Sequence, residues 1–424
     1  MKQPRQPLGR NFSLLLAGNV VSVLGSSIYL IVIILYLKEA TGSATLLGFY
    51  NFVALLPPVL LGPFAGAVVD RWSRRLALVW SDAARGILML LLAVAAMSPE
   101  GLSIPLLLVI TALAGICHAL FLPAVPALIP EIVAEPHLKR ANSLRAAGTQ
   151  IGNMTGNAVG GLIFAAVGLV PVLVVNGVSF LLSAFQESWI RVPTPPGAGG
   201  SGRVTGEGIR LSESRAGRGI VRQTVVGIRY LMRRRGLRAL LLANSAVFLL
   251  APPLLLVLPF VIEDTMGLPT AFVGLAFAVT LAGGIGAYLM WAAVPLSRSA
   301  DRVVLVGSFA ALALMLLLIA LLLTPWVLFG GLLVSGAAIA SINLMVNTVV
   351  QRTVPAGRRA RVFSLIESVA ALSTPFAYAA SGVLIDALMQ EIRLVFAVTG
   401  ALLAAAALLA AFSPGLRRVV TQPW

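Results

Sequence analysis

A few ionisable side chains lie inside stretches of the sequence that are otherwise long and apolar. Charged groups in such surroundings are costly to bury, and they usually pair with one another or exchange protons. Asp82 and Arg85 are three residues apart, which places them on one face of a helix as an ion pair. His118 can titrate near neutral pH. The candidates for charge pairing or proton coupling are Asp82, Arg85, His118, Arg145, Glu187 and Glu367.

Each candidate also has a simpler interpretation. Asp82 and Arg85 fall toward a helix end and are more readily explained as a structural ion pair. His118 is more readily explained as a hydrogen-bonded histidine that faces a cavity and moves no proton. Arg145 lies next to the position that matches Glu367 when the two halves of the chain are compared. We therefore expect Arg145 and Glu367 to form a gating contact across the halves.

The composition excludes several classes of protein. The 424 residues are 59% hydrophobic and 11% charged, with a mean hydropathy of +0.97, whereas soluble domains are about 25% charged. A soluble enzyme, a secreted disulfide scaffold and a disordered chain are all excluded. The single cysteine, Cys117, permits no internal disulfide and no cysteine-based metal cluster. With two histidines and no Walker A loop, the sequence predicts neither an enzyme nor a bound metal or cofactor.

Long uncharged stretches predict an all-α integral membrane protein. A membrane-spanning helix needs about 20 apolar residues. The uncharged stretches 146–186 and 303–351 are each long enough for two helices, with breaks near Gly168 and Pro325. Together with the other apolar stretches they predict twelve transmembrane helices.

The basic residues predict the orientation. With the N-terminus in the cytoplasm, nearly all loop Lys and Arg residues face inside, and only Lys38 and Arg393 face outside. This asymmetry is the positive-inside pattern, and it predicts that both termini are cytoplasmic. The net charge of +16 is thereby explained by topology, and we expect no binding to nucleic acid.

The chain divides into four predicted parts. Residues 1–192 and 237–413 are the two six-helix halves, residues 193–236 are a cytoplasmic linker, and residues 414–424 are a cytoplasmic tail. Within the linker, residues 220–235 combine helically spaced apolar residues with arginines. This pattern favours an amphipathic helix on the anionic inner leaflet, and a solvated basic linker is the alternative.

The two halves repeat. Arg140 matches Arg361 at an offset of 221, and Asp70–Arg71 matches Asp301–Arg302 at an offset of 231. Two halves in the same orientation form the parallel-repeat architecture of many transporters, whose substrate sites lie near the membrane midplane between the halves.

The most specific motif fits G-x-x-x-D-R-x-x-R-R and begins at Gly66. It resembles the signature loop of the major facilitator superfamily, and the resemblance covers nearly the whole chain. In that loop the acid meets a helix N-terminus and the arginines bind carboxylates, which implies a cytoplasmic gate. A plain topology-determining cluster of charges is the alternative. The gating residues are Gly66, Asp70, Arg71, Arg74, Arg75, Glu131, Asp301 and Arg302.

Two further stretches narrow the resemblance. The sequence from Phe121 to Glu131, followed by Arg140-Ala-Asn-Ser-Leu, is similar to the branch of enterobactin exporters and macrolide efflux proteins. The fifth helix is similar to the antiporter motif of proton-coupled drug exporters, with Asn157 in place of its proline. Close packing of small residues is the alternative. The residues of the helix 5 motif are Gly148, Gly152, Gly156, Asn157, Gly160 and Gly161.

The resemblance also implies that the first, fourth, seventh and tenth helices line a central cavity. Polar and aromatic residues follow these helices at helical spacing. Buried amides need partners, so each of them either lines the cavity or bonds one helix to another. The cavity candidates are Asn19, Ser22, Ser26, Tyr29, Thr111, Asn244, Phe248, Ser335, Asn343 and Asn347.

These observations predict a secondary active transporter that works by alternating access. Its expected role is proton-coupled export of amphiphilic small molecules, in the class of drugs or siderophores, with the proton gradient as the energy source. The alternatives are a uniporter or importer of a small metabolite, and a non-transporting membrane sensor or scaffold on a transporter fold. The expected partners are a small-molecule substrate and the lipid bilayer. We expect a monomer in a cell membrane, the bacterial inner membrane.

Overall fold

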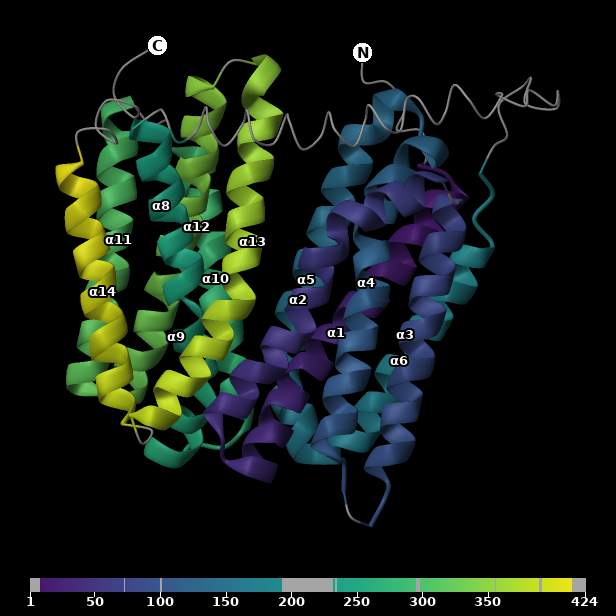
Figure 1. The fold of residues 1–424 in the computed structure, drawn as a ribbon, viewed down its shortest axis with the longest axis horizontal. Helices are drawn as coiled ribbons and strands as arrows, with labels where there is room; N and C mark the ends of the chain where they lie inside the picture. Colours follow the sequence, from purple (N-terminus) through teal and green to yellow (C-terminus); the bar gives the residue numbers. More distant parts are fainter. Residues whose placement is uncertain are drawn as a thin grey trace. The chain divides into compact units, whose positions relative to one another are not determined.

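The computed structural model describes residues 8–71, 73–99, 101–192, 232, 235–294, 298–354, 356–388 and 391–413. In these ranges the chain is helical, with short connections and no strand. The predicted linker and tail, apart from single positions, lie outside the described residues. The helices of the first half are α1 (Arg10–Thr41), α2 (Ala44–Arg71), α3 (Arg74–Ala96), α4 (Ile104–Ile132), η1 (Glu135–His137), α5 (Leu138–Val167) and α6 (Leu169–Ser188) (Figure 1).

The second half follows the same plan. Its elements are α8 (Arg235–Leu250), α9 (Pro252–Leu256), η2 (Phe260–Thr265), α10 (Ala271–Ala293), α11 (Arg298–Leu322), α12 (Pro325–Thr353), α13 (Ala356–Ala387) and α14 (Ile392–Phe412). The predicted breaks are confirmed, because α5 ends before Gly168 and α12 begins at Pro325. The seventh span is less regular than the sequence pattern indicates. It divides into α8, α9 and a π-helical turn, since Pro252, Pro253 and Pro259 lack the backbone donor that a helix interior needs.

Within the described residues, eleven helical segments are long and apolar enough to cross a membrane. The helix α5 has 30 residues but is not one of these eleven, because glycines and polar residues replace much of its apolar surface. A count of twelve spans and the cytoplasmic position of the termini therefore stay predictions.

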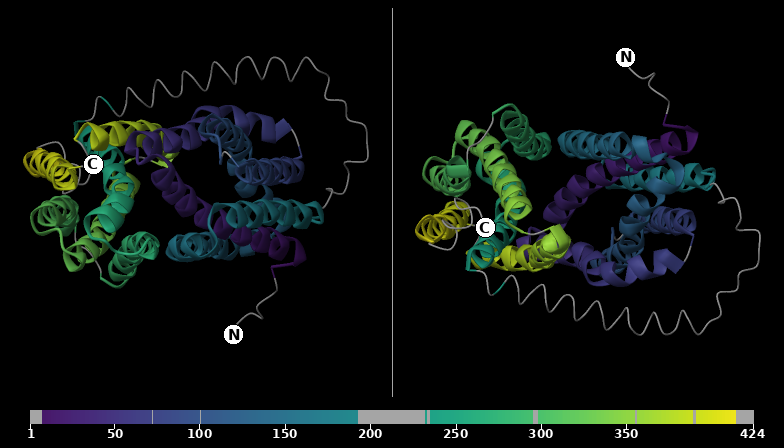
Figure 2. Two further views of the ribbon diagram at one scale, coloured as in Figure 1. Left: turned by 90° about the horizontal axis from the view of Figure 1, so that it is seen from below. Right: turned by 90° about the horizontal axis from the view of Figure 1, so that it is seen from above.

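The chain packs into two compact units, which we describe separately. The first unit contains residues 1–193, 252–281 and 374–395, and the second contains residues 194–251, 282–373 and 396–424. In the first unit, α1 packs on α5 and α6, α3 packs on α4 and α6, and α2 packs on α4. Figure 2 shows these helices nearly end on. In the second unit, α11 packs on α12.

Glycines and small polar residues set several helix ends in the first unit. Gly42 adopts a left-handed conformation with φ of 63°, and its N–H donates to the carbonyl of Lys38, which ends α1. Ser73 caps the start of α3. The starts of α1 and α3 and the ends of α4 and α6 share one end of the unit, which we call the arginine-rich end. An apolar cluster at this end includes Phe12, Leu78 and Leu128 and fixes these helix ends against one another.

Candidate functional site

Two buried carboxyl groups and a half-buried arginine meet between α3 and α6. The Nη1 atom of Arg85 lies 3.3 Å from Oδ1 of Asp82, as the spacing on α3 predicts. Asp82 and Glu187 are both 0% exposed, and Glu187 lies within electrostatic reach of Asp82 and Arg85. Within the described residues, neither carboxyl oxygen of Glu187 has a hydrogen-bond partner. Burying a charge costs several kcal/mol per ion unless partners compensate it, so this cluster is well suited to exchanging charge for a proton.

Close packing of α3 on α6 brings these groups together. A Cβ atom added at Gly86 of α3 would lie 2.9 Å from the carbonyl oxygen of Gly177 on α6. The two helix backbones can approach this closely only because both positions are glycine. As a result, Asp82 and Glu187 share one buried site although they are far apart in the sequence.

Aromatic rings surround the guanidinium of Arg85. Its Cζ atom lies 3.9 Å from the ring centre of Phe180 and 5.8 Å from that of Phe121. His118 stacks on Phe121 with a centroid distance of 6.0 Å. Rings stabilise a buried cation through their negative faces, and they supply a flat apolar surface beside it. Within the described residues, Nδ1 of His118 is buried without a hydrogen-bond partner.

A pocket of about 150 Å³ opens beside this cluster, and Arg85 belongs to both. Tyr50 and Tyr29 both line it, and the Tyr50 hydroxyl donates to the Tyr29 hydroxyl at 3.1 Å. The sequence analysis singles out Ser26, Tyr29, Thr111 and His118, all of which line this pocket. It misses several others, because nothing in their local sequence marks them. The lining is Ser26, Tyr29, Tyr50, Ala54, Arg85, Met89, Thr111, Ala114, Gly115, His118, Asn176 and Phe180.

The remaining cavity candidates divide into two groups. Asn19 accepts a hydrogen bond from Thr149 at 3.1 Å, so it joins α1 to α5, and Ser22 is buried. In the second unit, Asn244 and Ser335 are buried. The other three candidates there are half-buried, namely Phe248, Asn343 and Asn347. A shared central cavity lined by these residues stays a prediction.

The glycines of α5 form a smooth stripe against α1. Cβ atoms added at Gly148, Gly152, Gly156 and Gly160 would lie 2.6 to 3.1 Å from atoms of α1. Gly161 instead faces the start of α10, where an added Cβ would lie 2.8 Å from the carbonyl oxygen of Thr270. Close helix packing therefore explains why these positions are glycine. Asn157 lies beside them, and its backbone carbonyl is close to Gly274. A role for the motif in exchange stays a prediction.

At the arginine-rich end, the two described arginines of the signature loop have different partners. Arg74 binds the carboxylate of Glu131 at 2.6 Å and the carbonyl of Ala127 at 3.1 Å, which joins α3 to α4. Arg75 donates to the carbonyl of Ser188 at 2.6 Å, which joins α3 to the end of α6. A Cβ atom at Gly66 would meet open space. The side chains of Asp70 and Arg71 lie outside the described residues.

The second unit contains the repeat of this arrangement. Asp301, which matches Asp70, is 2% exposed and forms an ion pair with Arg352 at the end of α12. Arg302, which matches Arg71, donates to the carbonyl of Ala411 near the end of α14. Ion pairs therefore join the helix ends in both units. Arg145 belongs to the first unit and the exposed Glu367 to the second, so their contact stays a prediction.

The opposite end of the first unit contains a second charged cluster, which the sequence analysis misses. The Nζ atom of Lys38 lies 2.6 Å from Glu263 and 2.5 Å from Asp264, which joins the end of α1 to η2. Lys38 is only 9% exposed. The sequence analysis treats this lysine purely as a topology signal, and its acidic partners lie more than 200 residues away. The acidic pair Glu263–Asp264 opposite a lone lysine is the signal that could have revealed the contact.

Asp386 supplies a further contact at this end. Its carboxylate accepts hydrogen bonds from the Ser43 hydroxyl and from the backbone N–H groups of Ala44 and Thr45, at 2.8 to 3.0 Å. A carboxylate at a helix N-terminus satisfies unpaired donors and complements the helix dipole. Asp386 of α13 therefore caps α2 within the first unit. Among the described residues there is no group of three His, Cys, Asp or Glu side chains that could hold a metal ion.

Several known proteins are similar to this chain in sequence or in fold. Macrolide efflux protein A of Streptococcus pyogenes is 24% identical over 58% of this chain, and the match spans 58% of the length of that relative. The putative bacilysin exporter BacE of Bacillus subtilis is 34% identical over 33% of this chain and 34% of its own. A crystal structure of a bacterial homologue of the iron transporter ferroportin, in an inward-facing state, superimposes with a TM-score of 0.69 at 18% identity, covering 98% of this chain and all of that one.

The family assignment rests on the sequence. The family model of the major facilitator superfamily matches residues 15–366. This range includes the signature loop, the α5 glycines and most of the second-half repeat, and the helical structure agrees with it. Proteins of this family are transporters and not enzymes. The chain belongs to the major facilitator superfamily of membrane transporters.

Proposed function

We propose that this transporter exports amphiphilic small molecules, in the class of drugs or siderophores, in exchange for protons. The observation that carries the proposal is the buried Asp82–Arg85–Glu187 cluster beside the aromatic and polar pocket. Because Arg85 belongs to both, a change of charge in the cluster alters the electrostatics of the pocket. The protein acts as a monomer in the bacterial inner membrane with both termini in the cytoplasm.

The chemistry of the pocket supports an amphiphilic substrate. Two tyrosines, a phenylalanine and a methionine provide apolar surface, whereas Thr111 and Asn176 offer hydrogen bonds. Among the lining residues, Arg85 is the only one with a permanent charge, and its pairing with Asp82 offsets that charge. The named efflux and exporter relatives are consistent with this class of substrate.

The cluster supports proton coupling through Glu187. With Glu187 protonated, Arg85 balances one carboxylate, that of Asp82. With Glu187 ionised, one guanidinium must balance two carboxylates in a site from which water is largely excluded. Each transition between these states moves one proton and changes how strongly Arg85 is held near Phe180. In alternating access, the two halves rock around the site, so this proton enters from one side of the membrane and leaves to the other.

Transport in inside-out vesicles with an imposed pH gradient tests the proposal. We expect a macrolide to accumulate when the vesicle interior is acidic and to equilibrate without accumulation when the gradient is collapsed. Glu187→Gln should abolish accumulation but permit downhill flux. The control is Glu135→Gln, which neutralises an exposed carboxylate in η1 and should leave accumulation unchanged. Flux that ignores the gradient in the unmodified protein would contradict proton exchange and indicate a uniporter.

A further inference from the structure

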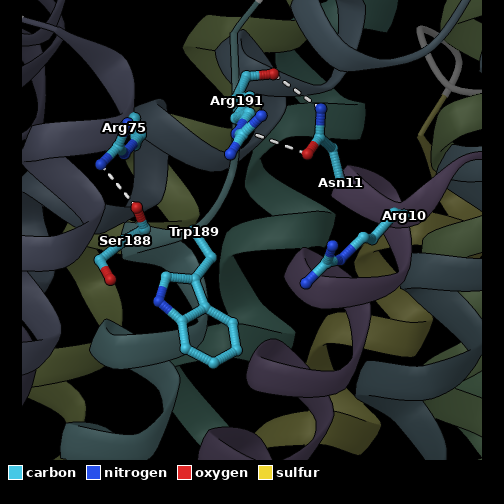
Figure 3. A pocket seen from close by; sticks show the side chains of 6 residues that line it. All are labelled: Arg10, Asn11, Arg75, Ser188, Trp189 and Arg191. Carbon is cyan, nitrogen blue, oxygen red and sulfur yellow. Dashed lines mark hydrogen bonds between the residues drawn. The ribbon is translucent and has the colours of Figure 1, made fainter.

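A second pocket lies at the arginine-rich end of the first unit and has no part in the transport site described above. Its volume is about 620 Å³, and it is formed by the start of α1, the start of α3 and the residues at the end of α6. Figure 3 shows three arginines, a tryptophan and two smaller polar residues around it. The lining residues are Arg10, Asn11, Arg75, Ser188, Trp189 and Arg191.

Hydrogen bonds hold the walls of this pocket in place. The side chain of Asn11 donates to the carbonyl of Arg191 at 2.7 Å and accepts from its backbone N–H at 3.2 Å. Arg75 donates to the carbonyl of Ser188 at 2.6 Å. Because these bonds use the backbone of Arg191 and not its guanidinium, they fix the chain while the charged group stays available. The pocket is therefore a built feature of three converging helix ends.

The charge of the pocket is positive. None of its lining residues is acidic. Within the part of the chain that the structure describes, the guanidinium groups of Arg10 and Arg191 have no carboxylate partner, and both residues are exposed. The Nε atom of Arg75 is buried without a hydrogen-bond partner. Arginine forks match the oxygens of a phosphate or carboxylate, so three of them around one pocket fit an anionic group.

An apolar surface continues from the pocket along α6. Trp189 at its edge is 52% exposed and lies 4.7 Å, centre to centre, from the ring of Phe185. Exposed side chains then recur every three or four residues on the same helix face. Tryptophan is typical of the level where lipid headgroups meet acyl chains. The exposed series on α6 is Val175, Val178, Leu182, Phe185 and Trp189, each between 42% and 62% exposed.

We propose that this pocket binds the phosphodiester headgroup of an anionic phospholipid, whose acyl chains lie along the exposed face of α6. The arginines supply charge for the phosphate, Trp189 marks the interface, and the α6 face supplies the surface for the chains. A soluble anion would bind the arginines but has no acyl chains to contact the exposed face of α6. The predicted orientation places the pocket at the cytoplasmic leaflet, which carries anionic lipids that basic pockets recognise.

Lipid binding can be measured on the purified full-length protein by native mass spectrometry. We expect phosphatidylglycerol to bind at least tenfold more tightly than phosphatidylcholine. The double variant Arg10→Gln/Arg191→Gln should weaken phosphatidylglycerol binding about 30-fold, since each cation near an anionic surface contributes ~1 kcal/mol. Trp189→Ala should weaken phosphatidylglycerol binding but leave the retention of inorganic phosphate unchanged.

The matched control is Arg140→Gln. Arg140 is an exposed arginine near the start of α5, on the same predicted side of the membrane but outside the pocket. Equal weakening by Arg140→Gln would show a diffuse charge effect and overturn the proposal. Full displacement of the lipid by millimolar inorganic phosphate would overturn it too, in favour of a soluble-anion site. These measurements require no transport, so their outcome is separate from that of the proposed function.

Discussion

Glu131 and Arg352 hold equivalent positions at the ends of α4 and α12, 221 residues apart, and carry opposite charges. Each forms an ion pair with the start of the preceding helix. Glu131 binds Arg74 of α3, and Arg352 binds Asp301 of α11. The two halves therefore keep the same connection between helix ends while its polarity is reversed. The repeat preserves an ion pair between the two helix ends, but the acidic and the basic residue have exchanged helices.

The two ion pairs should differ in their contribution to stability. Arg74 and Glu131 are each 33% exposed, and pairs near water contribute about 0–1 kcal/mol. Asp301 is 2% exposed although Arg352 is 43% exposed, and removal of Arg352 takes a partner from a buried carboxylate, which is costlier than the loss of a partner near water. We therefore expect Arg352→Gln to lower the thermal unfolding temperature in detergent much more than Arg74→Gln. Equal shifts for the two variants would contradict this assignment.

Loss of the Lys38 ion pairs should loosen the contact between α1 and η2. Lys38→Gln removes a cation that two carboxylates share at 2.6 and 2.5 Å. In a Cys117→Ser background with Ser26→Cys in the pocket, we expect an impermeant maleimide added from outside to react about tenfold faster, as for a change of ~1.4 kcal/mol. The control is Arg393→Gln, which removes the other predicted outward-facing loop cation, an exposed arginine. An unchanged rate in Lys38→Gln would mean that the ion pairs do not limit access to the pocket from this end.

Alanine at a glycine of the α5 stripe should be destabilising, in contrast to alanine at an open glycine. At Gly156 the new Cβ would lie 2.6 Å from Cβ of Ser27, so α1 and α5 must separate. At Gly307 on α11 nothing lies within 4 Å, and alanine favours a helix over glycine by about 1 kcal/mol. Gly156→Ala should lower the unfolding temperature, and Gly307→Ala should raise it or leave it unchanged. A stabilised Gly156→Ala protein would refute the close approach of α1 and α5.

Much of the helical framework follows from local sequence. Apolar stretches of membrane length predict most helices, and the breaks at Gly168 and Pro325 are visible as a glycine and a proline. The Asp82–Arg85 pair is predictable because both residues belong to one helix with a fixed spacing. Ser26 and Tyr29 share the pocket for the same reason, since they follow one face of α1.

Contacts between distant helices are not predictable in this way. Glu187 joins Asp82 only because α3 packs on α6 through Gly86 and Gly177, and no periodicity encodes that neighbourhood. Asp386 likewise caps α2 from a helix more than 300 residues away. The signal for such contacts is complementary charge at distant positions, and one sequence contains many combinations of that kind.

The polar, glycine-rich surface of α5 has a consequence for how the protein is made. This helix is not apolar enough to be one of the eleven membrane-spanning candidates among the described residues, yet its glycine stripe fits closely against α1. A segment with this many glycines and polar residues gains little free energy from transfer into lipid alone. Its insertion therefore depends on a protein surface that is already present. Since α1 leaves the ribosome well before α5, the growing chain supplies that surface in time. Biogenesis of this half should therefore fail at α5 whenever α1 is deleted, even if every other helix inserts.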